Sequence, residues 1–323
     1  MSAVILAAGE GRRLRPVTEH LAKPMVPVLN VPLLFWTAAA LTEAGATGLV
    51  ANIHTRPGQL RDAADRLRER DGIELDLVAE GRLSGPAGGL AACRERLPAA
   101  DCCLVVSGDA LTEVDLGEVV AAHRAAGADL TIVAKQVPDA HRFGVLELDG
   151  DEVVGLLEKP ADPPPGAVVS CGIYVLSARG LARLDPAVDD AYDFKHVVPA
   201  FLAGGLSVRA HRTDAYWTDV GTTEALRQAN IRALGTSALG KVAAPAGRGE
   251  LWWQGDVTCP GDLTVTGPVL LGADAVIGDG AVLERSVIGS GARVGAGARI
   301  SNSVVMPGAV VPAGQVVQEE VFL

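Results

Sequence analysis

The sequence has no long hydrophobic run and no excess of basic residues. None of its apolar runs approaches the ~20 residues that a membrane helix needs, so no membrane partner is expected. Lysine and arginine number 28 against 39 acidic residues, and the net charge of −11 argues against a nucleic-acid partner. Residues 2–8 are apolar without a preceding basic segment, which favours a buried first strand over a signal peptide.

The five cysteines form no CxxC pair, and their odd number argues against a disulfide framework. We therefore expect a protein of the reducing cytoplasm. With 323 residues, of which 49% are hydrophobic, the chain is long enough and apolar enough for two globular domains.

Strand-like and helix-like segments alternate through residue 235, a pattern typical of an α/β fold with a mostly parallel sheet flanked by helices. The Pro-rich residues 162–165 are expected to form a loop. Apolar runs predict strands at 3–7, 49–53, 75–78, 102–106, 130–134 and 172–176, and amphipathic patterns predict helices at 33–44, 59–69, 115–126 and 222–234.

Beyond residue 235, glycine and valine dominate. Every sixth residue from Leu270 to Met306 is apolar, a period typical of parallel β-helices. Three hexads are expected to form one triangular coil, so that 252–323 would hold about three to four coils. A β-sandwich is the alternative, but its turns recur every ~8–12 residues. The expected domains are 1–235 and 252–323, joined by a linker at 236–251.

A glycine-rich turn follows the first apolar run. Gly9-Glu-Gly11-Arg-Arg-Leu14 lacks the third small residue of the dinucleotide-binding fingerprint and the GK[ST] ending of a P-loop. The turn still offers backbone N–H groups, and cations follow it at positions 12, 13, 15 and 23. Such a turn can wrap a triphosphate. The alternative is a plain strand-to-helix turn.

This turn begins a longer pattern. Gly9-x-Gly11-x-Arg13-Leu14-x-Pro16-x-Thr18, followed by Lys23-Pro24 and Pro27-Val28, resembles the signature of the sugar-1-phosphate nucleotidyltransferases. Other segments resemble further motifs of this family in the same order, at 83–89, 105–109, 143–145, 157–160, 171–174 and 217–222. The resemblance implies a Rossmann-like mixed sheet, and several family members also carry a C-terminal left-handed β-helix. It also implies that an NTP and a sugar 1-phosphate are joined with release of pyrophosphate.

The resemblance further implies a nucleotide site and a metal site. The nucleotide would contact Leu6, Ala8, Gly9, Gly11, Arg12, Arg13, Lys23, Glu80, Gly85, Pro86 and Gly88. Arg13 and Lys23 would stabilise the charge that develops on the triphosphate and, with Asp109, are the expected catalytic residues. Asp109 and Asp219, acceptor-only groups at predicted strand ends, would hold Mg²⁺. The alternative for Asp109 alone is an Asx-turn after a strand.

The sugar phosphate would be bound by Gly144, Glu158, Lys159, Cys171 and Gly172. Lys159 would bind the phosphate, and Glu158 would accept hydrogen bonds from sugar hydroxyls. The alternative for both is a solvated charged surface, and the two glycines could equally serve turns or strand packing. Phosphoryl-type transfer needs alignment and cancellation of charge more than covalent help, which fits these residue types.

Three positions depart from the family pattern. Arg12 replaces a common threonine and either adds a phosphate contact or points to solvent. In the base loop Pro86 replaces a threonine, and Ser84 looks like an extra residue. Glu80 would suit guanine, whose N1–H and N2–H₂ groups lie side by side. The first choice of substrates is therefore GTP with mannose 1-phosphate or a related hexose or cyclitol phosphate, and the alternative is dTTP or UTP with glucose 1-phosphate.

Other functions compete with this interpretation. A hexapeptide β-helix often signals an acyltransferase, whose general base is typically histidine, but the last histidine here is His211. This favours a structural or homo-oligomerising role for the β-helix. A catalytically silent regulatory subunit would be expected to lose the metal aspartates or phosphate lysines, and all of these are present. The missing third glycine argues against an oxidoreductase.

Overall fold

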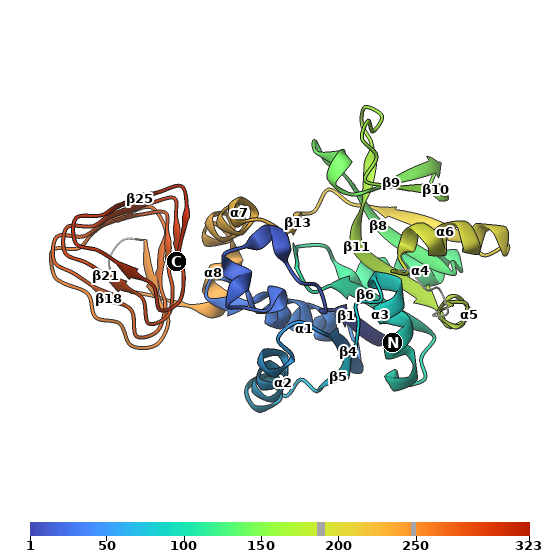
Figure 1. The fold of residues 1–323 in the computed structure, drawn as a ribbon, viewed down its shortest axis with the longest axis horizontal. Helices are drawn as coiled ribbons and strands as arrows, with labels where there is room; N and C mark the ends of the chain where they lie inside the picture. Colours follow the sequence, from blue (N-terminus) through green and yellow to red (C-terminus); the bar gives the residue numbers. More distant parts are fainter. Residues whose placement is uncertain (186–190, 247–249) are drawn as a thin grey trace. The chain divides into compact units, whose positions relative to one another are not determined.

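The computed structural model describes residues 1–185, 191–246 and 250–323 (Figure 1). These residues form two compact units. The first comprises Met1–Glu10, Leu21–Met25 and Leu33–Asp219, and the second comprises Gly11–His20, Val26–Pro32 and Val220–Leu323. The domain boundary expected at residue 235 and the linker at 236–251 stay predictions.

A mixed sheet forms the centre of the first unit, with nine strands in the described part of the chain. β5, β4, β1 and β6 run parallel, as do β8 and β12, while β11 is antiparallel to both β6 and β8. The strand order is β5 (Leu75–Ala79), β4 (Gly48–Ile53), β1 (Ser2–Leu6), β6 (Cys102–Ser107), β11 (Val168–Ser177), β8 (Leu130–Gln136), β12 (Val208–Arg212), β10 (Glu152–Glu158) and β9 (Gly144–Asp149).

Each predicted strand overlaps a strand of this sheet, although the one predicted at 3–7 ends one residue beyond β1, and this confirms the α/β fold class. The apolar runs do not predict β9, β10 and β12. Each of these strands has only one or two buried residues among half-buried or exposed ones, so it lacks the continuous apolar run that a fully buried strand shows.

The helices of the first unit begin and end at recognisable local signals. α2 starts at Pro57 and ends before Gly72, which adopts a left-handed conformation with φ 67°. The Asp115 side chain caps α4 by accepting from the Glu118 N–H. The helices are α1 (Leu33–Glu43), α2 (Pro57–Asp71), α3 (Pro86–Cys93), α4 (Leu116–Ala126), α5 (Ala178–Ala182) and α6 (Phe194–Ala203), with 3-10 turns η3 (Lys23–Met25), η4 (Arg94–Arg96) and η5 (Ala140–Arg142).

The amphipathic patterns predict α1, α2 and α4 but not α3 or α6. α3 is buried almost all round, so it has no polar face to produce a helical period. α6 carries Pro199 in its interior, which argues against a helix in a sequence reading. Within the described ranges, no helix is long and apolar enough to cross a membrane.

The second unit contains a β-hairpin, helices and a stack of short strands. β14 and β15 pair antiparallel, whereas β15 and the later strands pair with one another in parallel. Figure 1 shows the resulting triangular coils, which confirm the left-handed parallel β-helix. The elements are η1 (Arg12–Leu14), η2 (Val17–Glu19), β2 (Pro27–Val28), β3 (Val31–Pro32), α7 (Thr223–Leu234), α8 (Ser237–Val242), β14 (Ala244–Pro245), β15 (Leu251–Trp253), β16 (Thr264–Thr266), β17 (Val269–Leu271), β18 (Val276–Ile277), β19 (Val282–Glu284), β20 (Val287–Ile288), β21 (Arg293–Val294), β22 (Arg299–Ser301), β23 (Val304–Val305), β24 (Val310–Val311), β25 (Val316–Gln318) and β26 (Val321–Phe322).

The coils do not keep three hexads. Val265 pairs with Leu283, a step of 18 residues, but Leu283 then pairs with Ile300 and Ile300 with Val317, steps of 17 residues. The prediction of three hexads per coil is therefore wrong after the first coil. In the series of every sixth residue, Ile288 belongs to the core of the β-helix. In β18 and β19, however, the core residues are Ile277 and Leu283, one residue after the members of the series.

Buried serines close the shorter corner of two coils. The Ser286 hydroxyl donates to the Glu284 carbonyl at 2.6 Å and accepts from the Ser303 N–H at 3.2 Å. Ser303 repeats the first contact with the Ser301 carbonyl at 2.7 Å, and both serines are fully buried. Because these hydroxyls satisfy backbone groups at the corner, the coil can turn there with one residue fewer.

Side-chain amides fix the β2–β3 hairpin within the second unit. The Leu29 N–H donates to Asn230 Oδ1 at 2.8 Å, and Gln254 Nε2 donates to the Leu29 carbonyl at 3.0 Å. Asn30 Nδ2 donates to the Ile288 carbonyl of the β-helix at 3.1 Å. The hairpin that follows the glycine-rich turn in sequence is thus held by both α7 and the β-helix.

Candidate active site

The carboxyl ends of the parallel strands β1, β4 and β6 meet at one edge of the first unit's sheet. β6 ends at Ser107, and the Gly108 N–H then donates to the Leu6 carbonyl at 2.9 Å. A Cβ at residue 108 would lie 3.1 Å from that carbonyl oxygen, so glycine lets the chain pass close to β1. This close passage places Asp109 beside the end of β1.

Three charged side chains meet at this edge. Lys23, in η3, donates through Nζ to Asp109 Oδ2 and, at 3.1 Å, to Asp219 Oδ1. Asp219 ends β13 (Trp217–Asp219), which pairs antiparallel with β7 (Ala110–Thr112), so that Asp219 lies opposite Ala110. The structure thus brings together three predicted site residues that are far apart in sequence.

Burial and charge set the ionisation of this cluster. Burial lowers the pKa of Lys23, but the charges of Asp109 and Asp219 and their hydrogen bonds outweigh it, so the pKa lies above its ordinary value. Burial raises the pKa of Asp109, and the negative charge of Asp219 raises it further against the opposing effect of Lys23. The side chains of Lys23, Asp109 and Asp219 are only 11%, 28% and 16% exposed, so the charges depend on one another.

The donor set of this cluster fits a hard divalent cation. Asp109 and Asp219 supply carboxylate oxygens from two adjacent chain segments, held in place by the β7–β13 pairing. Among the described residues no group of three or more His, Cys, Asp or Glu could enclose a metal. Mg²⁺ is commonly bound by one or two carboxylates together with substrate phosphates, and this pair matches that use.

The glycine-rich turn divides between the two units. Leu6 ends β1, Ala8 is buried, and no atom lies within 4 Å of a Cβ placed on Gly9, so this part of the turn has open space beside it. Gly11 adopts φ 66° and directly precedes η1, in which Arg12 and Arg13 are exposed. The three residues of η1 and Gly11 belong to the second unit, and their role as phosphate ligands stays a prediction.

The loop predicted to bind the base is held on two sides. Gly85 has φ 81°, and α3 begins at the next residue, Pro86. The Tyr192 N–H donates to the Ser84 carbonyl at 2.8 Å, and the Tyr192 carbonyl accepts from the N–H groups of Ala87 and Gly88 at 3.1 and 3.2 Å. The start of α3 is therefore tied to the backbone of Tyr192.

Glu80, predicted as a base contact, forms hydrogen bonds within the protein. Its Oε2 accepts from the Ser84 N–H at 3.0 Å and from the Ser84 hydroxyl, and its Oε1 accepts from Asn52 Nδ2 at 2.5 Å. Sequence reasoning missed Asn52. The only sequence signal for Asn52 is that it is a polar residue near the end of an otherwise apolar strand. A buried amide, here only 3% exposed, needs hydrogen-bond partners.

Three of the predicted sugar-phosphate residues lie together. Gly144 begins β9 opposite Glu158 at the end of β10, and the next residue, Lys159, forms an ion pair with Glu158. Gly172, on β11, adopts φ 67°, and a Cβ there would lie 2.6 Å from Ser107 Oγ. Burial raises the pKa of Cys171 to about 12, which keeps its thiol protonated at neutral pH.

Sequence reasoning missed one further residue near these positions, Asp193, whereas Phe143 belongs to the predicted motif at 143–145. Asp193 caps α6; burial raises its pKa, and the negative charge of Glu158 raises it further. Phe143 contacts Trp217 edge to face, with ring centroids 5.3 Å apart, which links the strand that carries Asp219 to the start of β9.

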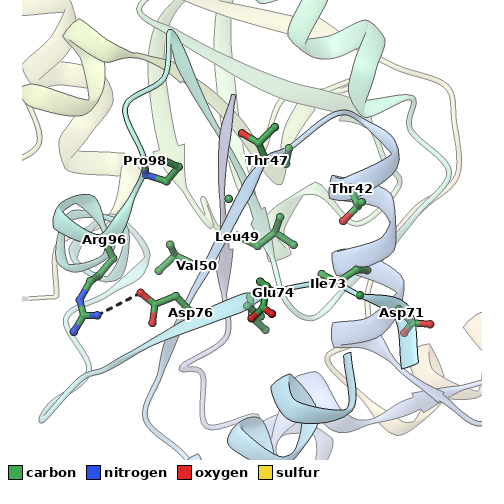
Figure 2. A pocket seen from close by; sticks show the side chains of 14 residues that line it. Thr42, Thr47, Leu49, Val50, Asp71, Ile73, Glu74, Asp76, Arg96 and Pro98 are labelled. Atoms are coloured by element: carbon green, nitrogen blue, oxygen red, sulfur yellow. Dashed lines mark hydrogen bonds and ion pairs between the residues drawn. The ribbon is translucent and has the colours of Figure 1, made fainter. Parts of the chain in front are cut away.

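A separate pocket of about 630 Å³ lies at the opposite end of the sheet (Figure 2). Gly48 and Leu75, the first residues of β4 and β5, line it, and Arg96 pairs with Asp76 at 3.5 Å across it. It contains none of the predicted site residues. Ligands of open α/β sheets bind at the carboxyl ends of the strands, so this pocket is not the candidate site.

Comparison with known proteins agrees with this geometry. A family model described as nucleotidyl transferase matches residues 2–235. A mannose-1-phosphate guanylyltransferase of Mycobacterium tuberculosis is 31% identical over 251 residues, covering 77% of this chain and 68% of its own. A glucose-1-phosphate thymidylyltransferase of Streptomyces griseus is 30% identical, covering 73% and 67%.

Other relatives share about the same identity. A UTP–glucose-1-phosphate uridylyltransferase of Synechocystis is 30% identical and covers 68% of this chain and 60% of its own. The chain thus spans roughly three fifths to two thirds of the curated relatives that it matches. A solved protein of Bacillus anthracis, provisionally named a glucose-1-phosphate thymidylyltransferase, shares the fold with a TM-score of 0.65 at 23% identity, covering 72% of this chain and 95% of its own. The chain therefore belongs to the nucleotidyl transferase family.

Proposed function

We propose that this protein is a sugar-1-phosphate nucleotidyltransferase. A phosphate oxygen of the sugar 1-phosphate forms a bond to the α-phosphorus of an NTP, and the bond from that phosphorus to the β-phosphate bridge oxygen breaks. The products are an NDP-sugar and pyrophosphate. The observation that carries the proposal is the Lys23, Asp109 and Asp219 cluster at the carboxyl edge of the sheet.

In this proposal Asp109 and Asp219 hold Mg²⁺, which supplies positive charge for the phosphate oxygens when it is bound. Lys23 carries its ammonium group on a flexible stem, so the group can turn from the carboxylates to a phosphate of the nucleotide. Arg13 and the backbone of Gly9 and Gly11 are proposed phosphate ligands on the sequence pattern. Arg12 is exposed, which suits either a further phosphate contact or solvent.

The sugar phosphate is proposed to bind at the ends of β9 and β10. In this proposal Lys159 neutralises the phosphate of the sugar phosphate, and Glu158 accepts a hydrogen bond from a sugar hydroxyl. The ion pair between Lys159 and Glu158 places both side chains at the same site. Gly144 and Gly172 are proposed to leave room for the sugar ring, and a Cβ on Gly144 would lie 3.3 Å from Glu158 Oε2, the proposed partner of a sugar hydroxyl. These contacts orient the attacking oxygen, which is the larger part of catalysis in such transfers.

GTP with mannose 1-phosphate, or a related hexose or cyclitol phosphate, is the proposed substrate pair. The Mycobacterium relative supports it, while the Streptomyces and Synechocystis relatives support the alternative of dTTP or UTP with glucose 1-phosphate. A non-catalytic regulatory subunit is the third candidate. The intact cluster of one lysine and two aspartates argues against it, because a silent subunit has no need of a metal site.

We place the protein in the reducing cytoplasm, which the five free cysteines support. The β-helix has no histidine to serve as an acyl-transfer base. A structural or homo-oligomerising role is therefore proposed for it.

The experiment is a screen of pyrophosphate release with five NTPs against a panel of sugar 1-phosphates, in the presence of Mg²⁺. The proposal predicts turnover with at least one pair, and the same pair should support the reverse reaction from NDP-sugar and pyrophosphate. Absence of turnover with every pair would favour the regulatory subunit.

A further inference from the structure

A series of hydrogen bonds connects the turn after β1 to the loop before α3. Asn52, near the end of β4, accepts through Oδ1 from the Ala7 N–H at 2.8 Å. Its Nδ2 donates to Glu80 Oε1 at 2.5 Å. Because the Ala7 group can only donate, it fixes which end of the Asn52 amide faces Glu80.

The far end of the series closes the loop. Glu80 Oε2 accepts from both the N–H and the hydroxyl of Ser84. The Glu80 carboxylate therefore connects Asn52 to Ser84. The Ser84 carbonyl in turn accepts from the Tyr192 N–H at 2.8 Å. The loop 80–84 is therefore held at Glu80 by Asn52, and at Ser84 by Glu80 and by the backbone of Tyr192.

Two glycines of α3 make room for these side chains. A Cβ on Gly88 would lie 2.7 Å from Ser84 Oγ, and a Cβ on Gly89 would lie 3.1 Å from Glu80 Oε1 and closer still to the Asn52 amide. Any side chain at either position would push the bridging groups apart. Gly88, predicted to contact the nucleotide, thus has a second reason to be glycine.

The hydrogen bonds of the Glu80 carboxylate limit how it can bind a nucleobase. A carboxylate offers about four acceptor positions, and three donors already occupy Glu80. Guanine presents two adjacent donors and needs two open acceptors. Glu80 cannot offer both while it holds Asn52 and Ser84.

We propose that Asn52, Glu80 and Ser84 are positioning residues that fix the base loop relative to the phosphate turn, and that Glu80 does not read the nucleobase. This inference rests on the proposed function. The three side chains set the spacing between Ala7, at the phosphate turn, and Gly85, at the start of the base loop. A nucleotide spans both segments, so the bridge lowers the entropy that binding would otherwise lose.

The test measures kcat and KM for every NTP that is turned over, in Asn52→Ala, Glu80→Gln and Ser84→Ala. Glu74→Gln, at the other end of β5, is the matched control because it is exposed and has no part in the bridge. Positioning predicts that the NTP KM rises about 10-fold or more in Asn52→Ala and Glu80→Gln by a common factor for all NTPs. The order of preference among the NTPs and kcat should change little.

A loss confined to one NTP in Glu80→Gln, with the other NTPs unaffected, would show that Glu80 reads the base and would overturn the proposal. Amide hydrogen exchange without ligand separates this result from the proposed function. Asn52→Ala should speed exchange at Ala7 and Ser84 but not at control amides in β8. Unchanged exchange would refute the bridge even in an active enzyme, whereas altered exchange without turnover by the wild type would refute only the proposed function.

Discussion

Lys23 occupies the centre of the charged cluster, and its removal gives the most informative stability measurement. In Lys23→Met the ammonium group that bonds both Asp109 and Asp219 is lost, and two carboxylates that share its position are left to repel each other. Methionine keeps nearly the length of the side chain, so the packing of η3 should change little. The effect then reports mainly on charge.

The structure gives the size of the effect. Breaking a buried ion pair by removing one partner costs about 3–5 kcal/mol. Asp109 and Asp219 keep 28% and 16% of their side-chain exposure, so solvent screens part of the repulsion and we expect a loss of about 2–3 kcal/mol. Mg²⁺ should replace the lost charge, and at 100 times its Kd it would restore about 2.7 kcal/mol.

The assay is urea unfolding of the full chain, with EDTA and with a series of Mg²⁺ concentrations. Lys241→Met, on the exposed side of α8, is the control and should stay within about 0.5 kcal/mol of the wild type. A loss below about 0.5 kcal/mol for Lys23→Met in EDTA would refute the ion-pair reasoning. A loss that Mg²⁺ does not restore would refute the assignment of the two aspartates as metal ligands.

Three further outcomes can be checked on the same protein. The hydrogen bond from Arg179 lowers the pKa of Asp129 to about 2 from 3.8, so Asp129 stabilises the fold by at most about 2 kcal/mol above pH 4, and this contribution disappears as pH falls through 2. Asp129→Asn should therefore lose stability at pH 7 and approach the wild type near pH 2 in urea unfolding; an equal difference at both pH values would contradict this. In Gly295→Ala the new Cβ would lie 2.7 Å from a Cα atom of the next coil; we expect a loss of about 1–3 kcal/mol, and an unchanged thermal midpoint would count against the close stacking of coils. Burial raises the pKa of Cys171 to about 12 while Cys259 is half-exposed, so iodoacetamide at pH 8 should modify Cys259 first in mass spectrometry, and early labelling of Cys171 would disprove its burial.

The sequence identifies the charged cluster because parallel strands bring their carboxyl ends to one edge. The motif residues Asp109 and Lys23 are 86 positions apart, yet each follows or faces a strand end that the apolar runs predict. The parallel β-helix can equally be predicted from the sequence, since its buried aliphatic residues repeat at a short period. These features depend on patterns that local sequence contains.

Other features depend on tertiary contacts that local sequence patterns do not predict. Asn52 gains its role from Ala7 and Glu80, which only the tertiary fold brings near it. The 17-residue coil follows from corners at which Arg285 and Asn302 adopt positive φ, a conformation that sequence reading assigns to glycine. In both cases tertiary contacts decide the local structure.

The central claim is that Asp109 and Asp219 hold the metal for nucleotidyl transfer, and initial rates of pyrophosphate release test it most directly. The rates of Asp109→Asn and Asp219→Asn are compared with those of Asp101→Asn, an exposed aspartate just before β6. We expect each of the first two variants to lose at least about 100-fold in rate while circular dichroism shows the fold intact. Asp101→Asn should remain near the wild type. Near-normal rates in either Asp109→Asn or Asp219→Asn would contradict the claim.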